Sequence, residues 1–251
     1  MPVARVLEGH EEIRDAYRDE HVARCYIDER FRQPLGALLH ARQAAHLVRL
    51  IRTLRPHTLL EVAPGPARLT VEVARVHRGS GIVIDASAPM LDEARRRLEA
   101  VARGRWRFVQ GDVFSLPISG TVDLVYAFRL IRHFDREDRR RIYAQIRGVL
   151  PPGGLLVFDA INKDVAAAVR ARSRECHHYD ALLTSDELRS ELGECGFDLV
   201  SLTGVQNGYP LLYRLQVLLA PRSPLLARAA LSLVDRLGSE PLEWIVTCRR
   251  P

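Results

Sequence analysis

Short apolar runs alternate with amphipathic segments through the middle of the chain, and this alternation constrains the fold more than any other feature. Each run is followed by a stretch whose apolar residues recur at the spacing of one helix face. The runs predicted to be strands are "HTLLEVA" (57–63), "GIVIDAS" (81–87), "WRFVQGD" (106–112), "VDLVYAF" (122–128) and "GLLVFDA" (154–160). Strands joined through helices pair in parallel and are covered on both faces, so the sequence predicts an α/β fold with a parallel sheet.

The segments outside this region predict further helices and a late strand pair. Residues 1–54 show helical spacing and are expected to form an N-terminal cap, or lid, on a cofactor-binding core at 55–206. Residues 207–240 contain two apolar helices that begin near prolines, and residues 241–251 form the final strand. Since no repeat or linker separates these parts, we expect one domain over residues 1–251.

The chain is basic, with a formal net charge of +6 and a pI of about 9.5, which would suit a nucleic-acid partner. Of the 37 basic residues, however, only Lys163 is a lysine, and the arginines alternate with acids in runs such as "DREDRRR". Such runs are typical of solvated helix faces. We therefore expect no nucleic-acid partner.

Cysteine usage and hydropathy indicate a cytoplasmic protein. Cys25, Cys176, Cys195 and Cys248 lie far apart in the sequence, so we expect reduced thiols. No run of about 18 apolar residues occurs, so no transmembrane segment is predicted. The first residues also lack the apolar core of a signal peptide.

Three acidic residues stand at the ends of the first three predicted strands: Glu61, Asp85 and Asp112. Ligands of open α/β sheets bind beyond the carboxyl ends of the strands, over the first strand-to-helix turn, which here contains Gly65. Asp85 is placed to accept both hydroxyls of a ribose, and Asp112 to reach an adenine amino group beside the Val113 backbone. Each acid taken alone could instead cap a helix or hold an ion pair.

Five motifs in order carry a family resemblance: "EVAPGPA", "VIDASAPML", "VQGDVFSLP", "VDLVYAFRLIRHF" and "LPPGGLLVFDA". Together they resemble the S-adenosylmethionine-dependent methyltransferases with a Rossmann-like fold, nearest to the branch of the ubiquinone and menaquinone C-methyltransferases. The resemblance runs from about Leu59 to Val205 and returns weakly at "LEWIVTC". It implies a seven-stranded, mostly parallel sheet with an antiparallel last strand, and S-adenosyl-L-methionine as the cofactor.

The glycine loop of this family departs from its usual pattern here. The loop normally reads acid-x-Gly-x-Gly-x-Gly, whereas this chain has Glu61, Ala63, Gly65 and Ala67. Each alanine adds one methyl group and disfavours a positive φ, so we expect an altered but competent loop. The residues predicted to bind the cofactor are Glu61, Ala63, Gly65, Ala67, Asp85, Ala86, Met90, Asp112, Val113 and Ala127.

The segment after the fourth strand, "YAFRLIRHFDRED", supplies the candidate catalytic residues. The resemblance places it near the transferred methyl group, so His133 is predicted to act as a base or to orient the acceptor. Arg129 or Arg132 would hold an anionic oxygen of the substrate. In the alternative, the arginines pair with nearby acids (Asp123, Asp135 or Glu137) and His133 caps the next helix.

The predicted substrate-binding residues are Tyr26, His178, Tyr209 and Tyr213. His177 and His178 are adjacent but lack a third ligand at a suitable spacing, so no metal site is predicted. Residues 207–240 could form a lid over an apolar pocket, pack onto the domain, or form a homodimer interface.

The sequence therefore predicts methyl transfer to a small-molecule acceptor that is apolar or similar to a lipid, quinone or polyketide. Two alternatives stay open at this point. One is a non-catalytic cofactor-binding or scaffold protein with a degenerate glycine loop, and the other is an RNA or protein methyltransferase.

Overall fold

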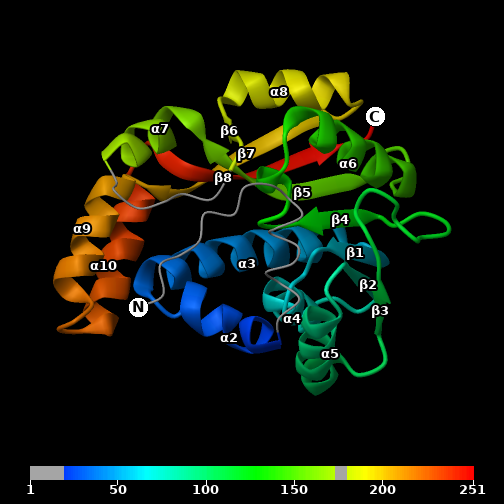
Figure 1. Cartoon of the computed structure of the whole chain (residues 1–251), viewed down its shortest axis with the longest axis horizontal. Coiled ribbons are helices and arrows are strands. Elements are labelled where there is room, and N and C mark those ends of the chain that lie inside the picture. The colour runs from blue at the N-terminus through cyan, green and yellow to red at the C-terminus, as the bar shows by residue number, and fades with distance from the viewer. Residues whose placement is uncertain (1–19, 173–179) are drawn as a thin grey trace.

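A computed structural model describes residues 20–172 and 180–251, and it contains the predicted sheet (Figure 1). The strands are β1 (Thr58–Val62), β2 (Ser80–Asp85), β3 (Trp106–Gln110), β4 (Leu124–Ala127), β5 (Leu155–Asn162), β6 (Leu182–Leu183), β7 (Asp198–Asn207) and β8 (Pro241–Arg249). Their order is β3-β2-β1-β4-β5-β8-β7, and the two-residue β6 pairs with β5. The last strand, β8, lies antiparallel between β5 and β7, which confirms the predicted fold class.

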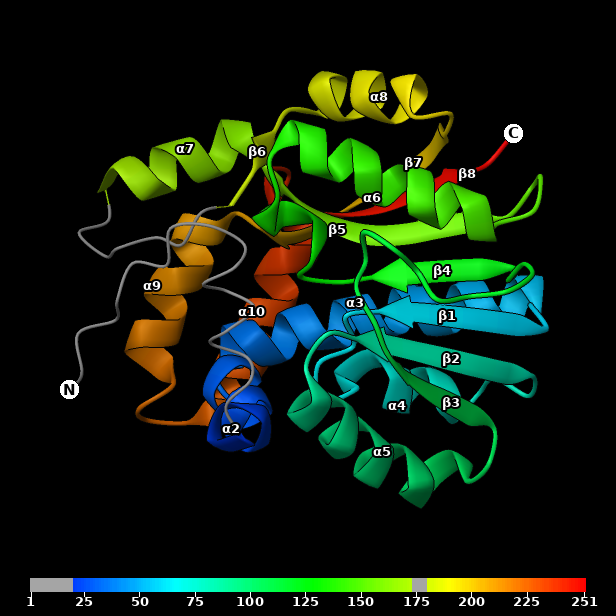
Figure 2. The ribbon, with the colours of Figure 1, turned by 45° about the vertical axis from the view of Figure 1, so that its right-hand side comes forward.

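Helices cover both faces of the sheet (Figure 2). Those of the amino-terminal part and core are α2 (Glu20–Phe31), α3 (Pro34–Leu54), α4 (Arg68–Ala74), α5 (Ala88–Ala102), α6 (Arg136–Val149), α7 (Lys163–Arg172) and α8 (Ser185–Glu194). In Figure 2, α4 and α5 lie below the central strands and α6, α7 and α8 above them, while α3 passes behind β1. The helices α3, α4 and α5 share one core with the sheet, and α6 and α8 share the other. The sheet therefore forms the middle of three layers. The sequence did not predict α7.

Successive strand residues point to opposite faces, so each strand contributes to two cores. On β1, Leu59 packs with α3, α4 and α5, while the neighbouring Leu60 packs with α6 and α8. On β4, Leu124 and Val125 divide in the same way. All four side chains have at most 1% of their surface exposed, which explains why these strands appear as continuous apolar runs.

Side-chain caps fix the helix starts that face the carboxyl ends of the strands. The Ser87 hydroxyl accepts the Met90 N–H at the start of α5, and the Asp135 carboxylate accepts the Asp138 N–H at the start of α6. Asp135, and not His133, is therefore the cap of α6. The alternative interpretation of His133 as a helix cap was wrong because His133 ends a short 3-10 turn, Ile131–His133, and lies two residues before the cap.

The segment 207–240 contains a helical hairpin made of α9 (Tyr209–Leu219) and α10 (Pro224–Leu237), as predicted. The inner faces of both helices pack on α3, and the small core between them contains Leu35, Leu38, Leu212, Ala227 and Leu231. Asp235 is buried on α10, where it pairs with Arg42 at 2.5 Å. The hairpin thus rests on the domain, at the left of Figure 1.

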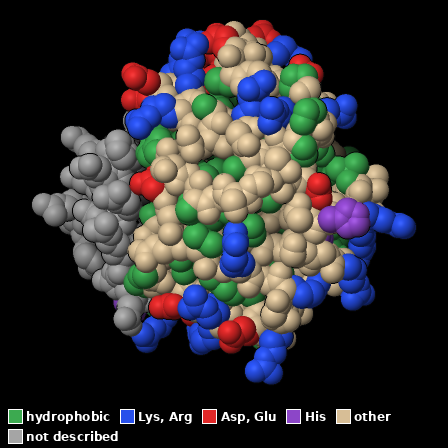
Figure 3. Space-filling model, turned by 90° about the vertical axis from the view of Figure 1, so that its right-hand side faces the viewer, with side chains coloured by type: hydrophobic (Ala, Val, Ile, Leu, Met, Phe, Trp, Pro, Cys, Tyr) green, Lys and Arg blue, Asp and Glu red, His purple; other side chains and the backbone are tan. Residues whose placement is uncertain are grey.

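The side of the molecule opposite the hairpin is the edge where the parallel strands begin (Figure 3). Apolar side chains form small separate patches there, and charged side chains of both signs lie around the rim. Within the described ranges, no helix is long and apolar enough to cross a membrane.

Candidate functional site

A cavity lies at the carboxyl ends of β1, β2, β3 and β4, where the sequence predicted a ligand site. Its wall combines the turns after these strands with one residue of α2, Tyr26. The predicted residues that line the cavity are Tyr26, Glu61, Ala63, Gly65, Asp85, Ala86, Met90, Asp112, Val113, Arg129 and His133. Residues from four separate turns therefore meet in one place.

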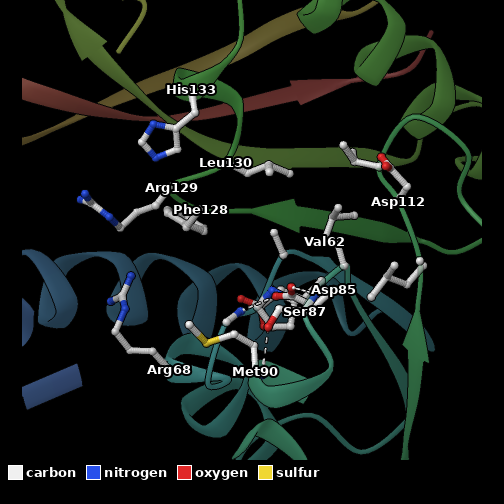
Figure 4. Close-up of a pocket in the computed structure, with 18 of the residues that line it drawn as sticks. Val62, Arg68, Asp85, Ser87, Met90, Asp112, Phe128, Arg129, Leu130 and His133 are labelled. Atoms are coloured by element: carbon white, nitrogen blue, oxygen red, sulfur yellow. Dashed lines mark hydrogen bonds between the residues drawn. The ribbon is translucent and has the colours of Figure 1, made fainter. Parts of the chain in front are cut away.

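Asp85 occupies the middle of the cavity wall and is held by backbone donors (Figure 4). Its carboxylate accepts the Gly65 N–H at 3.0 Å and the Ser87 N–H at 2.9 Å. Burial raises the pKa of this carboxyl to about 6, although these hydrogen bonds oppose the shift. Asp85 thus ties the glycine loop to β2 and presents a desolvated acid to the cavity.

Glu61 ends β1 as a second buried acid, with only 3% of its surface exposed. Burial raises the pKa of its carboxyl to about 7, and the hydrogen bond donated by the Thr70 hydroxyl opposes that rise. A ligand that brings a cationic or donor group to this wall would favour the ionised form.

The backbone of the glycine loop is left-handed at each of the positions where the family has glycine. The φ values are 52° at Ala63, 55° at Gly65 and 55° at Ala67. The expectation that the alanines avoid positive φ was wrong: both adopt it, at a cost of about 1–2 kcal/mol each. At Gly65 an added Cβ would meet nothing closer than the Met90 sulfur at 3.9 Å, so this backbone borders open space.

The turn after β3 supplies an acid and aromatic surface. Asp112 and Val113 line the cavity, and the Asp112 carboxylate accepts the Phe114 N–H at 2.9 Å. Phe114 stands edge-on to Phe134, with ring centroids 5.4 Å apart. This part of the wall could hold a flat ring with a polar edge.

The segment after β4 brings two of its three candidate residues to the cavity. Arg129 and His133 line it, and in Figure 4 the Arg129 side chain extends to the same side of the cavity as Arg68. Arg129 has a φ of 59°, and its N–H donates to the Asp159 carboxylate at 2.5 Å. The His133 Nδ1 lies 3.2 Å from the Asp180 carboxylate, which orients the ring.

Arg132 does not line this cavity, but it lines a second cavity beside it, which Arg129 also lines. Its guanidinium is buried and lies 3.1 Å from Asp159, 3.0 Å from Asp180 and 2.9 Å from Glu243. Burial lowers the pKa of Arg132, but the three carboxylates raise it more, so the net pKa lies above the usual value. These ion pairs join the turn after β4 to β5 and β8, and the catalytic role of Arg132 stays a prediction.

Arg68 is a cavity residue that the sequence analysis missed. Its side chain is buried, donates to His40 at 2.8 Å and Gln43 at 2.7 Å, and lies over the Phe31 ring. The pKa of Arg68 is lowered to about 10, mainly by burial and in part by the nearby Arg129. Among the described residues, no carboxylate forms an ion pair with either arginine. The signal available in the sequence was an arginine directly after the glycine loop, at the start of the mostly apolar helix "RLTVEVA".

Four further predicted residues lie elsewhere. Ala67 and Ala127 are fully buried in the core, so neither side chain reaches the cavity. Tyr209 lines a second cavity, which Arg129 also lines, so the two cavities meet at Arg129. Tyr213 is 49% exposed and lines neither cavity. His178, like His177, Tyr17 and Cys176, lies outside the described residues.

A comparison with protein families identifies the fold around this cavity. Residues 59–154 match the family model described as a methyltransferase domain. The chain carries a class I methyltransferase domain. Proteins of this family use S-adenosylmethionine as the methyl donor, so the resemblance read from the five motifs is confirmed at the level of the family.

Curated relatives match parts of this chain. It is 38% identical over 95 residues to carboxy-S-adenosyl-L-methionine synthase from Desulfotalea psychrophila, covering 35% of this chain and 37% of that protein. It is 24% identical over 175 residues to ubiquinone biosynthesis O-methyltransferase from Azorhizobium caulinodans, covering 65% and 68%. The match to the first of these relatives spans well under half of its length.

Solved structures share the fold of the methyltransferase domain. The magnesium protoporphyrin IX methyltransferase of Synechocystis, with bound S-adenosylhomocysteine, superposes with a TM-score of 0.66 at 12% identity, covering 96% of this chain and 99% of that one. The glycopeptide N-methyltransferase MtfA gives a TM-score of 0.59 at 19% identity, covering 83% and 87%. At these identities the likeness concerns the fold alone.

The cavity has the donor set that S-adenosylmethionine requires. Asp85 offers a desolvated carboxylate to hydroxyls, Glu61 offers a second, and Arg68 offers a buried cation without a carboxylate partner among the described residues. The open space beside Gly65 lets a ligand approach the loop backbone. The residues present are therefore suited to this cofactor.

Proposed function

We propose that this chain transfers a methyl group from S-adenosylmethionine to a small-molecule acceptor. The observation that carries the proposal is the meeting of Asp85, Glu61 and Asp112 with Arg129 and His133 in one cavity of a methyltransferase domain. When bound, S-adenosylmethionine supplies an electrophilic methyl group for an in-line displacement.

The cofactor roles follow from the chemistry of each side chain. Asp85 accepts the ribose hydroxyls, and Asp112 with the backbone of Val113 holds the adenine edge. Glu61 lies on the wall that carries the glycine loop and favours the cationic end of the cofactor. Arg68 holds the carboxylate of the methionine group, which compensates its buried charge.

The acceptor is proposed to lie between the two cavities, next to Arg129 and His133. Asp180 fixes the His133 ring through Nδ1, so Nε2 is the atom that takes the acceptor's proton as the methyl group is transferred. Burial alone would raise the pKa of Asp180, but His133 and Arg132 lower it below its usual value, so the carboxylate stays ionised beside the ring. This arrangement favours an O–H or N–H acceptor.

The second cavity indicates the class of acceptor. Phe31, Leu39, Ile161 and Leu242 give it apolar surface, and Tyr209 adds an aromatic ring with a polar tip. The rest of its lining is largely charged and includes Arg30, Arg132, Arg170, Asp180 and Glu243. Arg129 stands where the cavities meet. These features support an acceptor with an apolar body, such as a lipid, quinone or polyketide, and one acidic oxygen near Arg129.

The experiment is a product screen by mass: the chain is incubated with metabolite extracts and S-adenosylmethionine, and products that gain one methyl group are identified. The His133→Ala variant should retain cofactor affinity and lose about 10²–10⁴-fold in turnover of that acceptor. His57→Ala is the matched control, because His57 is exposed at the opposite end of β1. Normal turnover in His133→Ala would remove the base role, and no methylated product in any extract would contradict the proposed activity.

A further inference from the structure

The outer faces of α9 and α10 hold most of the exposed apolar surface of the described protein. Ten large apolar side chains are exposed in the described ranges, and eight of them belong to this hairpin. They are Leu211, Tyr213, Val217, Leu218, Leu225, Leu226, Leu233 and Leu237, with exposed fractions from 49% to 78%. Single exposed apolar residues are ordinary, but such a concentration on one hairpin marks an interaction surface.

The sequence spacing explains why these side chains remain outside. On α10, Leu226, Leu233 and Leu237 are seven and four residues apart and share one helix face, while Ala227, Leu231 and the buried Asp235 occupy the opposite face against α3. On α9, the buried Leu212 faces inward and Leu211 and Leu218 face outward. Each helix therefore has two apolar sides. The inner side packs against α3, and the outer side is exposed.

All exposed charges of the hairpin are positive. Arg214, Arg222, Arg228 and Arg236 are exposed, and the one acid, Asp235, is buried and paired with Arg42. Arg214 and Arg236 stand among the exposed apolar residues of their helices. Exposed leucines together with arginines are the combination by which helices lie in the interface of an anionic membrane.

We propose that the α9–α10 hairpin docks this protein on an anionic lipid bilayer surface, with the leucines in the interface and the arginines on the lipid headgroups. The positive charge of the hairpin favours an anionic bilayer over a second copy of this chain. Two copies of the helices α9 and α10 facing each other would bring arginines against arginines, since neither helix has an exposed acid and the next one along the chain, Glu240, lies three residues beyond α10. The formal net charge of +6 also attracts the whole chain to an anionic surface.

Vesicle sedimentation tests this proposal with the whole chain and without any substrate. The chain should sediment with vesicles of phosphatidylcholine and phosphatidylglycerol, and remain in the supernatant with phosphatidylcholine alone. Leu225→Glu with Leu226→Glu should abolish sedimentation, because these side chains are 76% and 64% exposed. Arg214→Gln with Arg236→Gln should lower the partition coefficient by about 25-fold, from about fivefold for each arginine.

The matched control is the pair Leu54→Glu and Val200→Glu, which adds the same charge at exposed apolar positions outside the hairpin, 50% and 49% exposed. This variant should sediment nearly like the unchanged chain. Equal binding to neutral and anionic vesicles, no binding to either, or equal loss in the control would overturn the proposal. A dimer in vesicle-free buffer that the Leu225→Glu, Leu226→Glu variant converts to a monomer would also overturn it, in favour of an interface between copies.

Discussion

Glu61 and Asp85 are carboxyl groups that the fold removes from water at the ends of adjacent strands. Both can be located from the sequence, because an acid directly after an apolar run stands at the carboxyl end of its strand. Their burial and raised pKa values could not be predicted, since these depend on the loop that closes over them. The local sequence thus predicted the positions of the two acids, whereas the tertiary structure determines their burial and their pKa values.

The raised pKa values predict that cofactor affinity depends on pH. With values of about 7 for Glu61 and about 6 for Asp85, the free site binds protons below neutral pH. Ribose hydroxyls and a cationic ligand group favour the ionised carboxylates, so binding releases protons there. Titration with S-adenosylhomocysteine from about pH 8 to about pH 5.5 should show affinity falling toward acid, by up to about tenfold per unit for each proton released. Affinity that stays constant or rises toward acid would contradict these roles.

Asp85→Asn should weaken the binding of S-adenosylhomocysteine by about 1–3 kcal/mol, because the amide replaces a charged acceptor with a weaker one. The control is Asp92→Asn, which removes one charge from an exposed position on α5, the helix that follows β2. Isothermal titration of both variants measures the difference. If the two variants bind alike, Asp85 does not contact the ligand.

Arg129 and Arg132, three residues apart, should respond differently to substitution. Arg132→Ala leaves Asp159, Asp180 and Glu243 without their buried cation, so the free energy of unfolding should fall by about 3–5 kcal/mol. Arg129→Ala should change it by less than about 0.5 kcal/mol and lower acceptor turnover instead. Urea denaturation of the two variants measures this difference, and a stable Arg132→Ala variant would show that the ion-pair network is dispensable.

The sequence could not predict this network, because its members lie up to 111 residues apart.

At the scale of elements, the glycine loop keeps its backbone shape although two of its glycines are replaced. The tertiary environment holds Ala63 and Ala67 in the left-handed region, and the Asp85 carboxylate ties the loop at Gly65. This explains why substitution at these positions does not by itself indicate a lost site. Local propensity predicted an altered backbone, and the surrounding fold overrode it.

Ala63→Gly should raise the free energy of unfolding by between zero and about 1.6 kcal/mol. Relief of the left-handed alanine contributes about 1–2 kcal/mol, and the greater chain entropy of glycine removes about 0.4–1 kcal/mol. Ala67→Gly should gain nothing, because its fully buried methyl group contributes about 0.8 kcal/mol to the core. Thermal and urea unfolding of the two variants provide the comparison, and a destabilised Ala63→Gly would show that the alanine is not strained.

Most elements could be predicted because their periodicity and their capping residues agree. The helix 88–102 and both hairpin helices follow their sequence patterns closely, with serine or proline at their starts. The helix α7 and the two-residue strand β6 were missed, since neither has a distinct apolar period. The lid interpretation of the hairpin named Tyr209, which lines the second cavity, and Tyr213, which lines neither cavity, and it stays a prediction.

For the whole molecule, the parallel order β3-β2-β1-β4-β5 places four strand ends around one cavity, and the antiparallel β8 extends the sheet beyond them. The sequence motifs predicted this arrangement because each motif follows one strand. The second cavity and its contact with the first at Arg129 could not be predicted, since α2, α7 and β8 reach it from distant parts of the chain.

The central claim is that the alanine-containing loop forms a working cofactor site, and isothermal titration of the folded chain with S-adenosylhomocysteine tests it most directly. The account predicts saturable binding of one molecule per chain, together with a raised unfolding temperature in its presence. A folded chain that gives neither binding heat nor a thermal shift would contradict the claim and leave a methyltransferase fold without its cofactor.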